Sequence, residues 1–173
     1  MIWLVAVALL GFRPQPGTTS SCDVSYSNAA DEVGSATATP RMVVSAPIVI
    51  IAVAVDSTSI QPRRFLMVST GVRFHVTEVL KGTLHDSILV LSGRFVRHDE
   101  FNSAPVPYRY ARESAMRGSC FTIEYRRGAT YLLLLAPEEG VLDIGWAPLL
   151  PVNEQLRGPD DPWLHWVRSH LVR

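Results

Sequence analysis

The stretch VRFHVTEVLKG, residues 72–82, decides the fold predicted for this chain. Its first five residues alternate between apolar and polar side chains, and this period of two is typical of a β-strand with one face exposed to water. The alternation ends near Glu78, as it does at a β-bulge or where strand pairing stops. Gly82 suits the turn that follows, and residues 87–95 (SILVLSGRF) are predicted to return as the second strand of a hairpin.

Other segments extend this β pattern. Residues 48–55 (IVIIAVAV) are apolar and rich in β-branched side chains, which is typical of a buried strand. Shorter strands are predicted at residues 120–125, at residues 131–135 and within residues 140–152. Residues 23–41 are predicted to be mostly loop apart from a short helix at NAADEV, and residues 97–119 to be a long loop with a helical turn at ARESAM.

The C-terminus carries the clearest helix signal. In DDPWLHWVRSHLVR, Asp160 or Asp161 can cap a helix and Pro162 suits its first turn. Trp163 and Val167 then fall on one apolar face, with two leucines beside them. We therefore predict a terminal helix packed on a sheet.

Composition limits the class of protein. Apolar residues make up 47% and charged residues 18% of the 173 residues, so the chain is expected to bury a real core. This length suits one domain. Sixteen Lys and Arg balance sixteen Asp and Glu, so no net positive charge draws the protein to nucleic acid.

The first 21 residues are predicted to be a signal peptide. MIWLVAVALLGF is an apolar run followed by Arg13, prolines and small residues, although no Lys or Arg precedes it. We expect a secreted or periplasmic protein. A lipid anchor at Cys22 has less support, because Thr19 occupies the place where a lipoprotein signal has leucine. No other run reaches the roughly 20 residues that a membrane helix needs.

The two cysteines are Cys22 and Cys120. In an exported protein an isolated pair most simply forms one disulfide bond, whereas in a cytoplasmic chain the same residues would be two thiols. Neither lies in a Cys-x-x-Cys pair, so the sequence predicts no structural zinc site and no thioredoxin-type centre.

The order of these segments resembles the netrin-like or tissue-inhibitor-of-metalloproteinase-like domains, especially short exported bacterial ones. The resemblance covers about residues 47–137. Its motif residues are Phe74, Val76, Val79, Lys81, Gly82, Cys120, Gly128, Tyr131 and Leu132. The resemblance implies a mainly β fold: a five-stranded Greek-key barrel of the oligonucleotide/oligosaccharide-binding (OB) type with a C-terminal α-helix, forming one domain over residues 22–173.

The resemblance also implies a non-enzymatic binding protein without a cofactor or bound metal. In the animal inhibitors, an N-terminal cysteine presents its amine and carbonyl to the zinc of a protease. Cys22 would take that place after cleavage, with Asp23 beside it, although the chain lacks the Cys-x-Cys start of those inhibitors. The expected partner is another protein, and a zinc protease is the more specific form of this hypothesis.

A second candidate surface lies in the long loop. Tyr108, Arg109 and Tyr110 are predicted to contact a partner, because exposed tyrosine and arginine are common at protein interfaces. The alternative is that the tyrosines pin the loop onto the barrel.

Two further patterns contain residue types that are used in metal binding or catalysis. The His-Asp-Glu run at 98–100 contains metal-ligand residue types, but three adjacent side chains cannot easily face one ion, which favours a solvated loop. Glu78, Glu124 and His75 would be an acid/base set for the alternative function, a small secreted hydrolase. No Gly-x-Ser-x-Gly, His-Glu-x-x-His or phosphate-loop motif is present.

Overall fold

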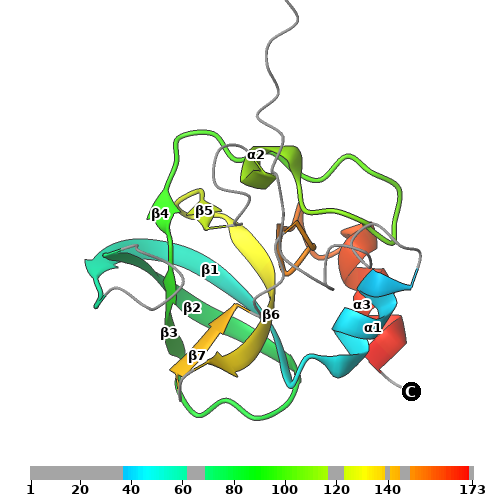
Figure 1. The fold of residues 1–173 in the computed structure, drawn as a ribbon, viewed down its shortest axis with the longest axis horizontal. Coiled ribbons are helices and arrows are strands. Elements are labelled where there is room, and N and C mark those ends of the chain that lie inside the picture. The colour runs from blue at the N-terminus through cyan, green and yellow to red at the C-terminus, as the bar shows by residue number, and fades with distance from the viewer. Residues whose placement is uncertain (1–36, 62–68, 117–122, 139–140, 145–148, 172–173) are drawn as a thin grey trace, which may run out of the picture.

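The structure is a computed structural model that describes residues 37–61, 69–116, 123–138, 141–144 and 149–171 (Figure 1). Its elements, in chain order, are α1 (Ala38–Ser45), β1 (Ile48–Ser59), β2 (Thr70–Lys81), β3 (Ile88–Ser92), β4 (Arg94–Phe95), α2 (Glu113–Met116), β5 (Glu124–Tyr125), β6 (Thr130–Glu138), β7 (Val141–Ile144), β8 (Asn153–Gln155) and α3 (Pro162–Leu171). The fold is mainly β and has the C-terminal helix that the sequence predicts. None of the helices in the described segments has the length and apolar character needed to cross a membrane.

The main sheet is antiparallel and runs in the order β3-β2-β1-β6-β7, with β8 paired to β6. The finer expectation of a five-stranded OB-type barrel is not confirmed, because no backbone ladder joins β3 to β7 within the described residues. One edge of β6 is divided between two short strands, with β7 along its second half and β8 along its first. At the seam between the end strands, the Ser92 hydroxyl donates to Asp143 Oδ2 at 3.0 Å.

The β1–β2 pairing is irregular where the sequence predicts it. The register skips Leu80 and then Thr77, on either side of Glu78 and Val79. These shifts change which face each side chain occupies, which accounts for the failure of the apolar alternation there. The predicted irregularity near Glu78 is therefore confirmed.

Aromatic side chains fill the centre of the core. Phe74 on β2 packs edge-to-face on Tyr125 and Tyr131, with ring centroids 4.9 and 6.0 Å away, and all three residues are fully buried. Burying a side chain of this size contributes about 1.5–3 kcal/mol. Four leucines that follow Tyr131 on β6 complete this core.

The motif residues at the strand ends have separate roles. Val76 is partly buried, and the Lys81 ammonium donates to the Val44 carbonyl at 2.6 Å, which joins β2 to α1.

Gly82 has φ +81° and lies so close to the backbone that an added Cβ would be 2.4 Å from the Pro47 carbonyl oxygen. Gly128 has φ +76°, with nothing within 4 Å of an added Cβ. Both glycines therefore meet a backbone requirement, and Gly82 meets a steric one as well.

The terminal helix α3 forms as predicted. Asp161 Oδ1 accepts a hydrogen bond from the Trp163 amide at 2.9 Å, and Pro162 is the first helical residue. Trp163 and Val167 are fully buried on the face that meets the core, and Leu164 is 2% exposed there.

The sequence did not predict α1, which replaces the end of the expected loop. Ala38, Thr39 and Val43 are its buried residues, and the helix packs beside α3 (Figure 1). Pro40 is in the first turn, where its missing amide breaks no helical hydrogen bond. Helical propensity is weak here, so the helix depends on packing.

Candidate functional site

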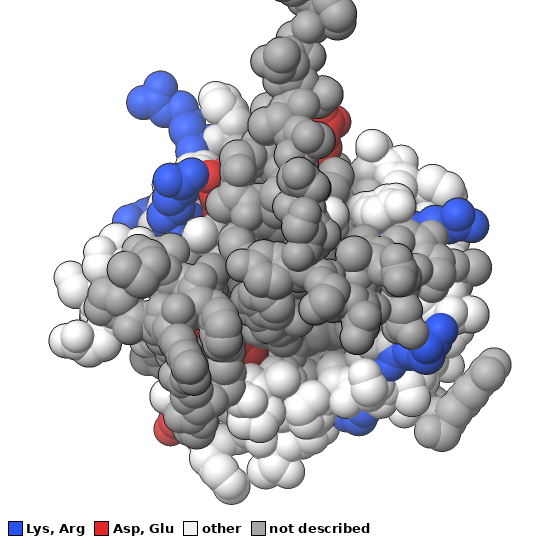
Figure 2. Space-filling view, viewed as in Figure 1, with Lys and Arg blue, Asp and Glu red and all other residues white. Residues whose placement is uncertain are grey.

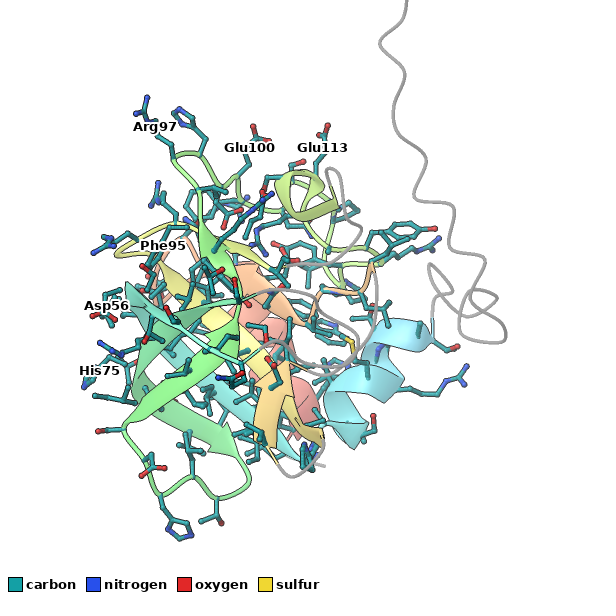
Figure 3. All side chains as sticks on the ribbon, turned by 60° about the vertical axis from the view of Figure 1, so that its left-hand side comes forward. Asp56, His75, Phe95, Arg97, Glu100 and Glu113 are labelled. Carbon is teal, nitrogen blue, oxygen red and sulfur yellow. The ribbon has the colours of Figure 1, made fainter. Side chains whose placement is uncertain are left out.

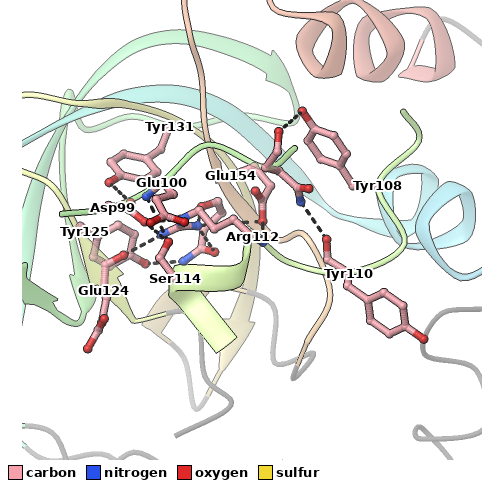
Figure 4. A network of polar contacts seen from close by, with 12 residues as sticks. Asp99, Glu100, Tyr108, Tyr110, Arg112, Ser114, Glu124, Tyr125, Tyr131 and Glu154 are labelled. Carbon is pink, nitrogen blue, oxygen red and sulfur yellow. Dashed lines mark hydrogen bonds and ion pairs between the residues drawn. The ribbon is translucent and has the colours of Figure 1, made fainter. Parts of the chain in front are cut away.

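Beneath the long loop lies a buried cluster of polar side chains centred on Arg112 (Figure 4). The Arg112 side chain has no exposed surface. Its guanidinium donates from Nε to Asp99 Oδ1 at 2.6 Å, from Nη1 to the Asn153 carbonyl at 2.6 Å and from Nη2 to the Glu124 carbonyl at 2.7 Å. Arg112 therefore links the loop to β8 and β5 at once.

Asp99 is the anionic partner within this cluster. Besides Arg112, it accepts hydrogen bonds from the Ser114 hydroxyl to Oδ1 at 2.8 Å and from the Tyr131 hydroxyl to Oδ2 at 2.6 Å. Burial raises the pKa of the Tyr131 hydroxyl well above its ordinary value, and the Asp99 charge raises it further. Tyr131 is therefore held as a neutral donor.

Glu154 brings a second carboxyl group to the same guanidinium. Its Oε1 accepts the Arg112 backbone amide at 3.0 Å and lies 4.0 Å from Arg112 Nη1. Burial raises the pKa of Glu154 to about 7, against the lowering effects of Arg112 and Asn102. Burial lowers the pKa of Arg112, but Glu154 and Asp99 outweigh this effect and leave it above its ordinary value. Two buried carboxyl groups thus share one cation.

The loop above this cluster encloses a groove of about 670 Å³, which we call the loop groove. Its lining residues are Thr39, residues 100–111 and Glu113. Asn102 holds the two arms together, because its Nδ2 donates to the Tyr110 carbonyl at 2.9 Å. Its Oδ1 accepts the Ala104 amide at 3.1 Å and orders its own arm. The groove is therefore preformed by bonds within the protein.

The structure separates the three loop residues that the sequence singled out. Tyr108 is buried and stacks on Trp163, with ring centroids 4.9 Å apart, while Thr39 Oγ1 donates to the Tyr108 carbonyl at 2.5 Å. Tyr108 thus pins the loop to α1 and α3, whereas the alternative interpretation expected both tyrosines to pin it onto the barrel. Arg109 and Tyr110 are exposed on the same arm.

The other chemical candidates are not brought together in one site. In the 98–100 run, His98 and Glu100 are exposed while Asp99 is buried in the Arg112 cluster. Across the described ranges, no group of three His, Cys, Asp or Glu side chains is arranged to hold a metal ion.

Both carboxylates of the proposed acid/base set are engaged in ion pairs. Glu78 forms an ion pair with Arg168 at 2.6 Å, and Glu124 pairs with Arg94. His75 is exposed on β2, and Figure 3 shows it on the sheet.

The sequence interpretation grouped Arg112 with the exposed side chains beside the loop tyrosines, but the structure buries it completely, and the sequence interpretation missed Glu154. The available signal was the polar triplet at 153–155, which directly follows the apolar residues 149–152. The predicted disulfide and wedge residues Cys22, Asp23 and Cys120 lie outside the described residues, as does the 1–21 segment.

No protein-family model matches this chain, and no curated protein matches it either. The functional proposal therefore depends on the geometry of the loop groove and of the cluster beneath it.

Proposed function

We propose that this protein is a non-enzymatic binding module that holds a segment of another protein in the loop groove. The observation that carries the proposal is a preformed groove of about 670 Å³ with partly exposed aromatic side chains in its wall, Tyr110 at 45% and Phe101 at 36% exposure. This volume falls within the range of binding sites, and exposed aromatics are enriched at protein interfaces.

Binding accounts for the buried charges better than catalysis does. Asp99, Arg112 and Glu154 have little or no exposed surface, and their hydrogen bonds fasten the loop to the sheet. A general acid or base must reach the atom to which it transfers a proton. The alternative, a small secreted hydrolase, therefore has weaker support.

The charge distribution favours a protein partner over nucleic acid. Lys and Arg side chains lie in separate groups on the described part of the face in Figure 2, and the chain has no net charge. Nucleic-acid binding depends on clustered positive charge.

The finer parts of the proposal concern the scaffold and the N-terminus. We assign residues 22–173 to a netrin-like OB-type domain, supported by its antiparallel sheet, its aromatic core and the tight turn at Gly82. Export after a signal peptide at 1–21 and a Cys22–Cys120 disulfide belong to the same proposal.

The most specific form of the proposed function is inhibition of a zinc protease, with Cys22 as the residue that meets the zinc. The purified chain beginning at Cys22 should then slow members of a panel of zinc proteases, and a chain extended by one N-terminal residue should not. Equal rates with and without the protein across the panel would exclude this form.

Selection of random peptides on the whole protein tests groove binding. Selected peptides should bind the wild type and lose affinity for Tyr110→Ala. The matched control is Val79→Ala, which removes an apolar side chain that is 41% exposed on β2, outside the groove lining. Peptides that bind all three proteins equally, or a selection without binders, would contradict the proposal.

A further inference from the structure

Three exposed arginines lie at one corner of the molecule, just past the ends of β4 and β5. The two strands are parallel, and their pairing continues beyond the ladder because the Val96 amide donates to the Tyr125 carbonyl at 2.8 Å. The residue after Val96 therefore lies beside the residues after Tyr125. These residues, which we call the arginine corner, are Arg97, Arg126 and Arg127. Figure 2 shows Lys and Arg side chains gathered over β4 and β5.

The neighbouring carboxylates are engaged elsewhere. In the ladder, Glu124 pairs with Arg94, and along the chain Asp99 is buried against Arg112. The next exposed carboxylate, Glu100, lines the loop groove. Within the part of the chain that the structure describes, no arginine of the corner forms an ion pair. The corner is therefore locally positive, although the chain as a whole has no net charge.

One guanidinium group of the corner is held in place before any ligand arrives. The Arg127 Cζ lies 4.7 Å from the centroid of the Phe95 ring, and Phe95 is partly buried against the core. Because a cation is attracted to an aromatic face, Arg127 loses less freedom on binding than an unsupported side chain would. An added Cβ at Gly128 would meet nothing within 4 Å, so the turn beside Arg127 is open to a ligand.

The chemistry of the corner suits carboxylates. A guanidinium group can donate two parallel hydrogen bonds to one carboxylate, and the pairing is strengthened by charge. A single nucleic-acid strand would instead use a long positive groove with aromatic rings on which its bases stack. Here Arg127 covers one face of the Phe95 ring, and the group of cations over β4 and β5 is separate from the others on the face in Figure 2.

From these features we infer that the arginine corner docks an acidic segment of a protein partner, whose Asp or Glu side chains pair with Arg97, Arg126 and Arg127. None of these arginines lines the loop groove, so this is a second surface, separate from the one that carries the proposed function. The occupant is argued from charge complementarity and from the fit between guanidinium and carboxylate groups.

The test uses the full chain and a hexaglutamate peptide with a neutral fluorophore, with binding followed by fluorescence anisotropy. At low ionic strength the probe should saturate the protein and bind at least tenfold more tightly than a glycine–serine peptide with the same label. Its affinity should fall as salt is added, because exposed charges are screened. Unlabelled hexaglutamate should displace the probe at a lower concentration than oligothymidylate or a sulfated oligosaccharide of the same charge.

Variants locate the binding surface. Arg97→Gln and Arg126→Gln should each weaken the probe about threefold, and the double variant about tenfold, because each removes one exposed cation that the probe contacts. The matched control is Arg109→Gln, which removes an exposed arginine of the loop groove and changes the net charge by the same amount. The control should bind the probe as the wild type does, and circular dichroism should show the same fold for all variants.

Equal weakening by Arg109→Gln and Arg126→Gln would show a response to net charge alone and would overturn the inference. Affinity that does not change with salt, or more effective displacement by oligothymidylate or the sulfated oligosaccharide, would overturn it as well. The proposed function is tested separately, because peptides selected for the loop groove are judged by Tyr110→Ala, and Tyr110 is not part of the arginine corner.

Discussion

Replacing Glu154 by glutamine tests the central feature of the buried cluster, two carboxyl groups that share one guanidinium. Glutamine keeps an oxygen that can accept the Arg112 amide hydrogen bond, but it cannot ionise. Since burial raises the folded-state pKa of Glu154 from 4.5 to about 7, the folded protein holds this proton more tightly than the unfolded chain does.

The sign and size of the effect follow from proton linkage. Below pH 4.5 the carboxyl group is neutral in both states, and its contribution to stability is fully present. Between pH 4.5 and about 7 the unfolded chain releases the proton first, so each pH unit lowers the free energy of unfolding by about 1.4 kcal/mol. The total loss is on the order of 3 kcal/mol, and above pH 7 it no longer grows.

Urea unfolding followed by tryptophan fluorescence measures this effect, because Trp163 is fully buried. The free energy of unfolding should be compared for wild type and Glu154→Gln at pH 4.5, 6, 7 and 8 at constant ionic strength. The variant should become more stable relative to the wild type as pH rises from 4.5, and this gain should level off near pH 7. Glu78→Gln, which removes an exposed carboxylate paired with Arg168, is the matched control. If the free energies of unfolding of the wild type and Glu154→Gln differ by the same amount at every pH, the reasoning is refuted.

Three other changes test separate parts of the structure. Arg112→Lys should lower the free energy of unfolding by about 3 kcal/mol or more in urea titrations. An ammonium group cannot make the same forked set of hydrogen bonds, and the partners of Arg112 would stay buried. A loss below about 1 kcal/mol would contradict the role of the cluster in fastening the loop to the sheet. Gly82→Ala should lower the melting temperature clearly more than Gly128→Ala. Both substitutions strain a positive φ of about the same size, but only the added Cβ at position 82 would meet backbone, at 2.4 Å. Equal melting temperatures would show that the close approach relaxes at little cost. The proposed export predicts that intact mass, measured with alkylation before and after reduction, shows loss of residues 1–21 and a Cys22–Cys120 disulfide. Two thiols alkylated without reduction would exclude the bond.

The β framework was predictable because its signal is local. The alternation around Phe74 marks β2, and the Asp161-Pro162 start marks α3, since a period or a cap is written within a few neighbouring residues. Helix α1 was missed because Pro40 and β-branched valines give weak helical propensity, and its stability comes from packing on α3. Strand β8 was missed because its three residues are polar, although all of them are buried.

The candidate site was harder to predict because its parts are distant along the chain. Arg112 looks like a surface residue in the sequence, yet its partners lie 13 positions before it, at Asp99, and 41 positions after it, at Asn153. A buried charge is recognisable only once its partners are known, since the same residue alone would be too costly to bury. The sequence indicated the loop as a place of interest, but it did not show that Tyr108 is an anchor and Tyr110 part of a wall.

The ion pair between Arg112 and Asp99 also explains how an irregular loop can hold a groove open. The pair closes the base of the segment between them, and Asn102 joins its arms higher up, so the loop is ordered before it meets a ligand. Ordering a flexible loop on binding would otherwise subtract from affinity. Stability and binding should then respond differently to two kinds of change. Loss of Arg112 should weaken binding without removing a ligand contact, because the free loop becomes less ordered. Loss of the Tyr110 ring should weaken binding while stability changes little, because Tyr110 is 45% exposed.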